Sequence, residues 1–239
     1  MASAGHAPSD KATEVRAMFS TIAPRYDALN RLLSFGIDRR WRVQAARAAL
    51  RGDARRVLDV ATGTGDLAFT LSALAPEAEV VGVDFAEPML ELARAKAPGR
   101  GGRVRFEVGD GTALAYPDDS FDAVTIAYGL RNFDDLDGGL REFLRVLRPG
   151  GRLVVLEFPP PPGGLFGGLY RLYFTRVLPA VGGLISGRES AYRYLPQSVL
   201  AFPAPEVLAQ RMRGAGFVGV SYRLQTFGVS AIHLGEKRT

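Results

Sequence analysis

The chain has 239 residues, of which 47% are hydrophobic and 23% charged, and its net charge is +5. These values fit one globular domain of the α/β size class. The absence of cysteine excludes disulfides and thiolate metal sites, so a reducing cytoplasm is the expected setting. The only histidines are His6 and His233, and no metal-dependent chemistry is expected.

Residues 1–10 lack the apolar region of a secretory signal, and no apolar run reaches the length that spans a membrane. The positive charge is spread out, without a run of five or more like charges, so no nucleic-acid-binding tail is expected. Three interpretations of the positive charge stay open. The arginines are a solvated surface, a contact with nucleic acid or a contact with an anionic membrane surface.

The first 50 residues carry helical patterns. Val15, Met18, Phe19 and Ile22 form a one-sided apolar stripe, and Pro24 ends that helix. Further helical pieces follow at 29–33 and from Asp38. We expect residues 1–50 to form a helical segment that either packs on the core or closes over the ligands as a lid.

Strand patterns then alternate with helical patterns over residues 51–158. The expected strands are Arg56–Val60, Glu79–Asp84, Val104–Val108, Phe121–Ala127 and Arg152–Phe158. Pro88 marks a helix start, and another helix runs from about Leu136 to Leu147, with Asp134 and Asp135 at its N-terminus. The segment 148–151 should end that helix.

The last part of the chain contains a helical insertion at 159–203, a helix near Pro205–Arg213 and strand patterns at Val218–Leu224 and Val229–Gly235. The whole pattern predicts a doubly wound, mainly parallel, seven-stranded sheet, with the last two strands as an antiparallel pair at one edge. One domain, 1–239, is expected. It comprises the N-terminal segment 1–50, a cofactor-binding core 51–158, the insertion 159–203 as a substrate pocket and the C-terminal part 204–239.

A glycine turn follows the first expected strand, with Gly63 and Gly65 in a G-x-G spacing. The third glycine of a dinucleotide-binding turn is missing, since Ala68 and Phe69 stand there. Asp84 ends the next strand, where a carboxylate accepts hydrogen bonds from ribose hydroxyls.

The charges near this turn favour one class of cofactor. Asp59 and Asp66 suit a cationic ligand better than a pyrophosphate. S-adenosylmethionine, with an ammonium, a sulfonium and no phosphate, is therefore the predicted cofactor.

Two further segments follow expected strands. Asp110 and Gly111 come after the third strand, where a carboxylate can receive the adenine amine; the alternative is a turn aspartate that caps its own backbone. Residues 128–133 place a guanidinium and a carboxamide, Arg131 and Asn132, where a methyl acceptor should lie. The alternative there is an exposed surface turn.

The insertion 159–203 is rich in Gly, Leu, Phe and Tyr. The preferred interpretation of this insertion is an apolar pocket for a hydrophobic acceptor, and the alternative is an extension of the core. Its polar cluster is Tyr192, Arg193 and Tyr194.

Several of these segments together resemble the ubiquinone/menaquinone biosynthesis C-methyltransferases, from about Val15 to Lys237. The motifs that carry the resemblance are Ala23-Pro24-Arg25-Tyr26-Asp27, Ser34-Phe35-Gly36-Ile37 with Trp41, Gly63-Thr64-Gly65-Asp66, Tyr128-Gly129-Leu130-Arg131-Asn132, Arg148-Pro149-Gly150-Gly151 and Tyr192-Arg193-Tyr194-Leu195. Ala127 and Thr62 depart from the pattern of some members.

The resemblance implies donor-binding positions at Thr64, Asp84 and the pair Asp110-Gly111, beside the expected Asp59, Gly63 and Gly65. It also implies a polyprenylated quinol acceptor, methylated on ring carbon. The favoured reaction converts demethylmenaquinol to menaquinol in menaquinone biosynthesis. The alternatives are the benzoquinol ring of ubiquinone biosynthesis, or an RNA or other small-molecule methyltransferase.

Under that interpretation Arg131 and Asn132 stabilise the quinol as its phenolate. Its proton leaves through a water held by Asp110, Asn132 or Tyr26. The acceptor-binding residues are expected to be Tyr26, Tyr128, Arg131, Asn132, Tyr192, Arg193 and Tyr194. A cytoplasmic protein with transient contact at the inner membrane surface is expected, with a homodimer left open.

Overall fold

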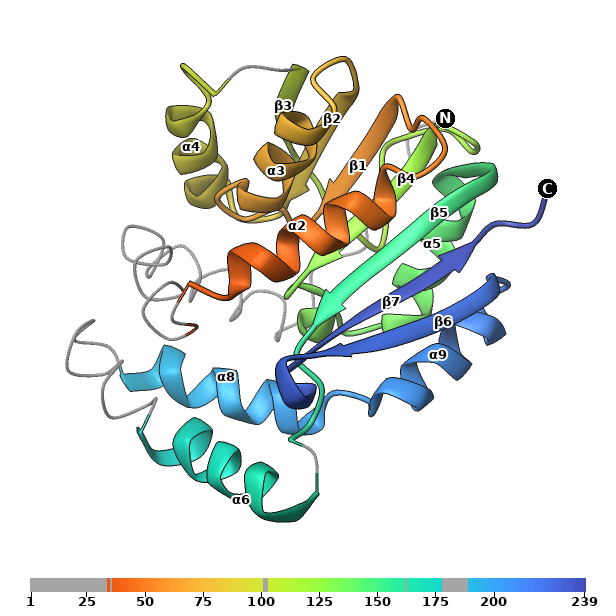
Figure 1. Ribbon diagram of the computed structural model, residues 1–239. Coiled ribbons are helices and arrows are strands. Elements are labelled where there is room, and N and C mark those ends of the chain that lie inside the picture. Colours follow the sequence, from red (N-terminus) through yellow and green to blue (C-terminus); the bar gives the residue numbers. More distant parts are fainter. Residues whose placement is uncertain (1–33, 35, 101–102, 162, 178–188) are drawn as a thin grey trace.

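The computed structural model of the protein describes residues 34, 36–100, 103–161, 163–177 and 189–239 (Figure 1). The predicted N-terminal helix and Tyr26 lie outside these residues. Within the described part of the chain, none of the helices has both the length and the apolar character needed to cross a membrane.

A seven-stranded sheet forms the centre of the molecule, with the order β3-β2-β1-β4-β5-β7-β6. Its first five strands in the chain pair in parallel, and β7 pairs antiparallel with both β5 and β6. The strands are β1 (Arg56–Val60), β2 (Glu79–Asp84), β3 (Arg103–Val108), β4 (Phe121–Ala127), β5 (Leu147–Glu157), β6 (Val218–Gln225) and β7 (Ser230–Glu236). The predicted mainly parallel, seven-stranded sheet is confirmed.

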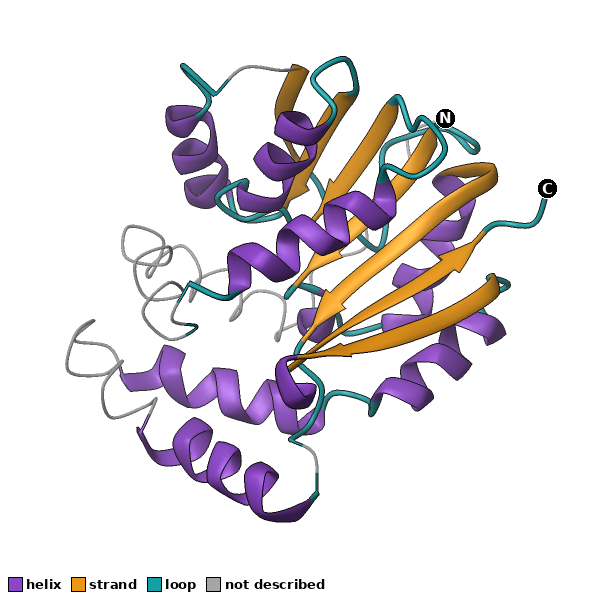
Figure 2. Cartoon of the chain, in the orientation of Figure 1, coloured by secondary structure: helices purple, strands orange, loops and turns teal. Residues whose placement is uncertain are grey.

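Helices cover both faces of this sheet (Figure 2). One face carries α2 (Asp38–Ala49), α3 (Asp66–Leu74) and α4 (Glu87–Lys96), and the other carries α5 (Leu136–Val146) and α9 (Pro205–Gly214). Successive residues of β1 show why both layers are needed, because Val57 packs with the first group and Leu58 with the second. Both side chains are fully buried, as expected of a central parallel strand.

Local signals start the helices where the sequence predicts. Asp135 caps α5 by accepting a hydrogen bond from Gly138 N at 2.8 Å, and Pro88 lies in the first turn of α4. Helix α5 then buries Leu140, Phe143 and Val146 on one side.

The start of β5 differs from the prediction. Leu147, expected to close the preceding helix, is the first residue of β5 and pairs with Phe121. The pairing then shifts, so that Ala123 faces Arg152. The reason is long-range, because Gly150 N donates to Lys237 O at 3.0 Å and Lys237 N donates to Gly151 O at 2.8 Å. Backbone hydrogen bonds to the C-terminal segment thus replace a further helical turn at residues 147–151.

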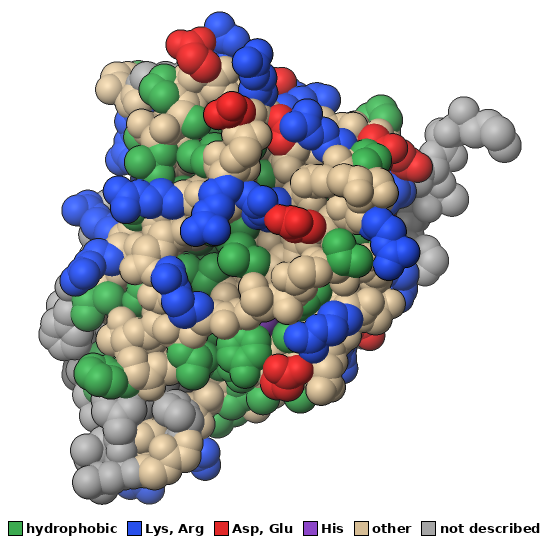
Figure 3. Space-filling model, turned by 45° about the vertical axis from the view of Figure 1, so that its right-hand side comes forward, with side chains coloured by type: hydrophobic (Ala, Val, Ile, Leu, Met, Phe, Trp, Pro, Cys, Tyr) green, Lys and Arg blue, Asp and Glu red, His purple; other side chains and the backbone are tan. Residues whose placement is uncertain are grey.

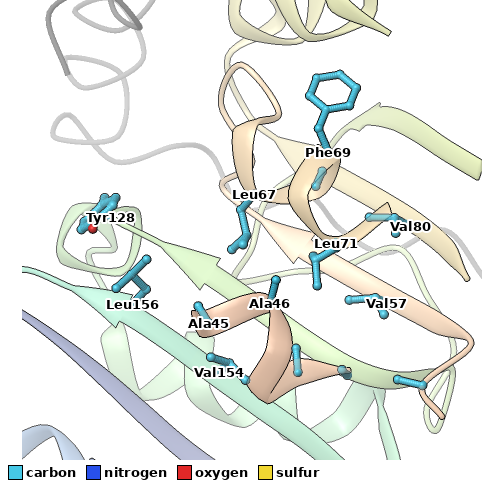
Figure 4. Packing of buried hydrophobic residues seen from close by; sticks show 14 of the residues in the cluster. Ala45, Ala46, Val57, Leu67, Phe69, Leu71, Val80, Tyr128, Val154 and Leu156 are labelled. Atoms are coloured by element: carbon cyan, nitrogen blue, oxygen red, sulfur yellow. The ribbon is translucent and has the colours of Figure 1, made fainter. Parts of the chain in front are cut away.

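Helix α2 packs into the core by a face of small residues. Ala45 and Ala46 are fully buried beside Leu67 and Leu71 of α3 and Val154 of β5 (Figure 4). The helix is therefore part of the core in the described residues. The lid expected from 1–50 concerns mainly residues 1–33, which lie outside them.

The insertion after β5 is helical, as predicted. It contains α6 (Gly164–Leu172), a π-helix η2 (Tyr173–Val177) and α8 (Glu189–Ala201). Both α-helices lie beyond the carboxyl ends of the central strands in Figure 1. Helix α8 also contacts η1 (Leu130–Asn132), the short 3₁₀ helix after β4. This places the insertion beside the predicted acceptor segment.

The close packing of α2 predicts that the variant Ala46→Leu is destabilised. Ala46 has no exposed surface, so three added carbon atoms should lower the free energy of unfolding by about 1–3 kcal/mol. Chemical denaturation followed by circular dichroism measures the change. Ala48→Leu on the same helix is the control, because Ala48 is only half-buried. Equal stability of Ala46→Leu and the parent protein would contradict this account of the helix.

Candidate active site

The loops after β1, β2, β3 and β4 meet at the carboxyl edge of the sheet. Strand β1 has β2 on one side and β4 on the other, which makes this edge the topological switch point. Ligands of open α/β sheets bind at such a point. The glycine turn, Asp84, Asp110 and residues 128–132 each follow one of these strands at this edge.

Asp84 ties the β1 and β2 loops together. One carboxylate oxygen accepts from Gly63 N at 2.8 Å, and the other accepts from Ala86 N at 2.9 Å. The side chain is buried, and burial raises the pKa of Asp84 while these backbone donors oppose the rise. The carboxylate thus fixes the shape of the glycine turn, and each oxygen keeps lone-pair capacity beyond these bonds; its contact with ribose hydroxyls stays a prediction.

The glycine at position 65 serves packing as well as the turn. Its φ is +84°, and a Cβ there would lie 2.8 Å from Phe106 Cζ and 2.9 Å from Phe69 Cε2. Those rings are T-shaped neighbours 5.4 Å apart. The residue type at 65 is therefore explained by backbone conformation and by the aromatic pair behind the turn.

A cavity lies between the glycine turn, α2 and the end of β4. Asp59 and Asp66 lie in its wall together with a single cation among the described lining residues, Arg42. The complete lining is Arg42, Asp59, Ala61, Thr62, Gly63, Thr64, Asp66, Leu67 and Ala127. Two carboxylates in the wall disfavour a phosphate and suit an ammonium and a sulfonium. The residues present thus fit the predicted cofactor.

Asp59 is the most perturbed acid of this cavity. It is 1% exposed, and its oxygens accept from the hydroxyls of Thr62 and Thr125, both at 2.7 Å. Burial raises the pKa of Asp59 to about 6, although the two hydroxyls lower it. Neighbouring Asp84 adds a smaller upward shift. The carboxyl is therefore ready to be ionised by an incoming cation.

The loop after β3 reaches the same edge. A Cβ at Gly111 would lie 2.5 Å from Phe133 Cζ and 2.7 Å from Val60 Cγ1, so this loop packs closely on the segment after β4. Asp110 is exposed and accepts from Thr112 N at 2.8 Å through one oxygen. The turn-capping alternative thus describes part of what Asp110 does, and its adenine contact stays a prediction.

Arg131 forms a buried ion pair that the sequence analysis did not anticipate. Its Nη1 lies 2.7 Å from Glu157 Oε1 at the end of β5, and it also donates to the Tyr128 carbonyl. The side chains are only 5% and 1% exposed. Burial raises the pKa of Glu157, with Arg131 opposing the rise. The sequence signal for this ion pair was Glu157, an acidic residue at the end of an apolar strand.

This pair changes how Arg131 can act. The positive charge of Arg131 is compensated by Glu157, so the guanidinium acts on a ligand as a fixed hydrogen-bond donor within a neutral pair. Its Nε is buried without a hydrogen-bond partner among the described residues. A buried N–H group without a hydrogen-bond partner destabilises the folded protein, and an oxygen atom of a ligand would supply the missing acceptor.

Tyr194 and Asn132, both predicted to bind the acceptor, lie together. The Tyr194 hydroxyl donates to Asn132 Oδ1 at 3.0 Å, across 62 residues of chain. Burial raises the pKa of Tyr194, so the hydroxyl stays protonated at neutral pH. Tyr192 and Arg193 lie on the same helix, but their side chains are outside the described residues.

Tyr128 lies between the cavity and Arg131. Its ring stacks on Phe158 at 4.3 Å, Arg42 lies 5.5 Å from the ring centroid, and burial raises its pKa. The residue is 7% exposed and has a φ of +59°. It thus packs beside Arg42, which lines the cavity, and its contact with the acceptor stays a prediction.

Known proteins of one family resemble this chain in sequence over nearly its whole length. The profile of the ubiE/COQ5 methyltransferase family matches residues 8–237. The chain is 64% identical over 220 residues to a demethylmenaquinone methyltransferase of Thermus thermophilus, covering 92% of this chain and 100% of that one.

It is also 51% identical over 232 residues to a ubiquinone/menaquinone biosynthesis C-methyltransferase of Geobacter sulfurreducens, covering 96% of this chain and 90% of that one. Among solved structures, a SAM-dependent methyltransferase of Thermotoga maritima has a TM-score of 0.67 at 22% identity. The match covers 93% of this chain and 99% of that one. This likeness confirms the predicted fold.

The position of Asp84 predicts that Asp84→Asn weakens binding of S-adenosylhomocysteine by about ten- to a hundredfold, the effect of losing a charged hydrogen-bond acceptor. Isothermal titration calorimetry measures the affinity. The matched control is Asp122→Asn. Asp122 is also buried and also accepts two backbone N–H bonds, from Arg55 and Arg56, but it belongs to the opposite end of β4. Equal losses in both variants would contradict ribose binding at Asp84.

The raised pKa of Asp59 predicts pH-dependent binding. A cationic ligand group favours the ionised carboxyl, so binding near pH 6 should release protons. Affinity for S-adenosylhomocysteine should then rise about tenfold between pH 5 and pH 7 and level off above.

Calorimetry in two buffers of different ionisation enthalpy measures the proton release. Asp59→Asn should remove both the release and the rise. Proton uptake, or the same pH profile in that variant, would contradict the assignment.

Proposed function

The chain belongs to the ubiE/COQ5 methyltransferase family and is an S-adenosylmethionine-dependent methyltransferase, and we propose that its acceptor is the ring carbon of a polyprenylated quinol. Demethylmenaquinol is the favoured acceptor, because the Thermus thermophilus relative at 64% identity is named for it. The benzoquinol of ubiquinone biosynthesis is the second candidate, since the Geobacter sulfurreducens relative is named for both pathways.

One observation carries the acceptor proposal. The buried Nε of Arg131 has no hydrogen-bond partner among the described residues and stands beside the Asn132–Tyr194 pair. A quinol oxygen is an acceptor of the kind that these donors require. Tyr194 occupies Asn132 Oδ1, which leaves the amide N–H groups of Asn132 to donate elsewhere.

These residues then favour reaction at carbon. A phenol is mostly neutral at pH 7, and its anion places negative charge on the adjacent ring carbon. Hydrogen bonds from Arg131 and Asn132 stabilise that anion. Glu157 holds the Arg131 guanidinium in place and keeps the pair neutral before the acceptor binds. When bound, S-adenosylmethionine supplies the electrophilic methyl group.

The acceptor-binding set of the proposal is Tyr26, Tyr128, Arg131, Asn132, Tyr192, Arg193 and Tyr194. Proton removal through a water held by Asp110, Asn132 or Tyr26 belongs to the same proposal. We further propose a cytoplasmic enzyme that contacts the membrane surface transiently, since its acceptor carries a polyprenyl chain. A homodimer is compatible with this proposal.

An RNA methyltransferase is the alternative from another class. Its support is the net charge of +5. On the face shown in Figure 3, however, Lys and Arg side chains are accompanied by acidic and hydrophobic ones, which is not the continuous basic surface that tracks a phosphate backbone.

The direct test is the quinone content of cells that lack this chain. We expect mass spectrometry to find a naphthoquinone lighter by one methyl group, and re-expression of the chain to restore the parent mass. A benzoquinone intermediate lighter by one methyl would transfer the proposal to ubiquinone. An unchanged quinone profile, with methyl-deficient RNA, would overturn it.

The Arg131–Glu157 pair predicts a loss of turnover that spares donor binding. Because Arg131→Met alone would leave Glu157 buried and unpaired, the variant is Arg131→Met combined with Glu157→Gln. We expect kcat to fall by about 10²–10³, the effect of losing an oxyanion donor. The affinity for S-adenosylhomocysteine should be unchanged. Glu157→Gln alone also leaves a buried charge unpaired, that of Arg131, but it keeps the guanidinium donor and should therefore retain more activity than the double variant. A parallel loss of donor affinity would contradict the assigned role.

A further inference from the structure

Arg42 is a buried cation that the proposed methyl transfer does not use. It lies on α2, is 7% exposed and forms part of the wall of the cavity beside the glycine turn. Its Nη1 is paired with Asp38, one turn earlier on the same helix. A charged side chain this deeply buried needs a compensating group, and Asp38 supplies it in the unliganded protein.

The order of the loops indicates which part of the donor reaches Arg42. The predicted adenine contact is in the loop after β3, and the ribose contact is Asp84 at the tip of β2. Continuing along the carboxyl edge in the order β3-β2-β1-β4 leads to the cavity between β1, β4 and α2. The amino-acid end of the donor therefore belongs in the cavity that Arg42 lines. This step rests on the donor site described above.

The amino-acid end carries two opposite charges. Its ammonium suits the carboxylates of Asp59 and Asp66, but its own carboxylate would be repelled by them. Among the described lining residues, Arg42 alone can offset that repulsion. A guanidinium has five N–H donors in a planar fork that matches a carboxylate, and Asp38 engages only one of its nitrogens in the hydrogen bonds of the described chain.

We propose that Arg42 binds the carboxylate of the methionine moiety of S-adenosylmethionine. Asp38 holds the guanidinium against the cavity wall and keeps its charge paired until the ligand enters. Tyr128, whose ring centroid lies 5.5 Å from the guanidinium carbon, limits its movement on the other side. Arg42 then acts as a determinant of donor specificity, because it rejects nucleosides that lack the carboxylate.

A purely structural Arg42 makes a different prediction. In that case it braces α2 against Tyr128 and Asp38, and its loss affects all adenosine ligands alike. The helix has other anchors, including the buried Ala45 and Ala46 and the bond from Trp41 Nε1 to Thr226 Oγ1 at 3.0 Å. The fold should therefore survive a change at position 42.

The test compares two ligands that differ in one group. S-adenosylhomocysteine carries the ammonium and the carboxylate, and its decarboxylated analogue keeps the ammonium alone. Calorimetry measures both affinities in the full-length protein and in Arg42→Gln combined with Asp38→Asn, which removes both members of the buried ion pair. We expect the variant to lose about 30-fold or more in affinity for S-adenosylhomocysteine and little for the analogue. The preference of the parent protein for the carboxylated ligand should collapse.

Two further variants sharpen the result. Arg47→Gln, at an exposed arginine of the same helix, should leave both affinities unchanged. Arg42→Lys should recover part of the preference, since it restores the charge without the fork. Thermal melting reports whether each variant is folded.

Equal losses for both ligands, or a preference that survives in the double variant, would overturn the proposal. Failure of the parent protein to bind either nucleoside would overturn the donor site and this proposal with it. Binding as expected without methylation of any quinol would support the role of Arg42 and overturn the proposed acceptor instead.

Discussion

The hydrogen bond from Gly63 N to the Asp84 carboxylate is the constraint on which the rest of the site depends. It joins the turns that follow two neighbouring parallel strands, and Ala86 N holds the second oxygen of the same carboxylate. Both loops are thus fixed to one buried group before a ligand arrives. A site that is already ordered loses little conformational entropy on binding.

The two buried arginines around this edge are both held in ion pairs. Arg42 is compensated by Asp38 on α2, and Arg131 by Glu157 at the end of β5. Pairing avoids the cost of an isolated buried ion, while each guanidinium retains N–H groups beyond those used by its partner. The same principle therefore serves the donor end and the acceptor end of the site.

Tyr128 connects those two ends. Its ring faces Arg42 and stacks on Phe158, while its carbonyl accepts a hydrogen bond from Arg131. Its positive φ turns the chain sharply after β4, so that ring and carbonyl serve different neighbours. In the proposed reaction this residue fixes the separation between the carboxylate-binding arginine and the one that faces the quinol oxygen.

The sequence alone determined the order and type of the core elements and the places of the glycine turn and Asp84. The bounds of β1, β2 and β4 match the prediction residue for residue. They could be predicted because apolar runs and the helical patterns between them are properties of short segments of sequence. The glycine turn and Asp84 could be predicted for the same reason, because each lies at the end of a short apolar run. Only the tertiary structure decided the partners. Arg131 meets Glu157 across 26 residues, Tyr194 meets Asn132 across 62, and Lys237 sets where β5 begins. Strand order and helix packing create these contacts, so a pattern in one short segment could not show which distant residue each of them meets.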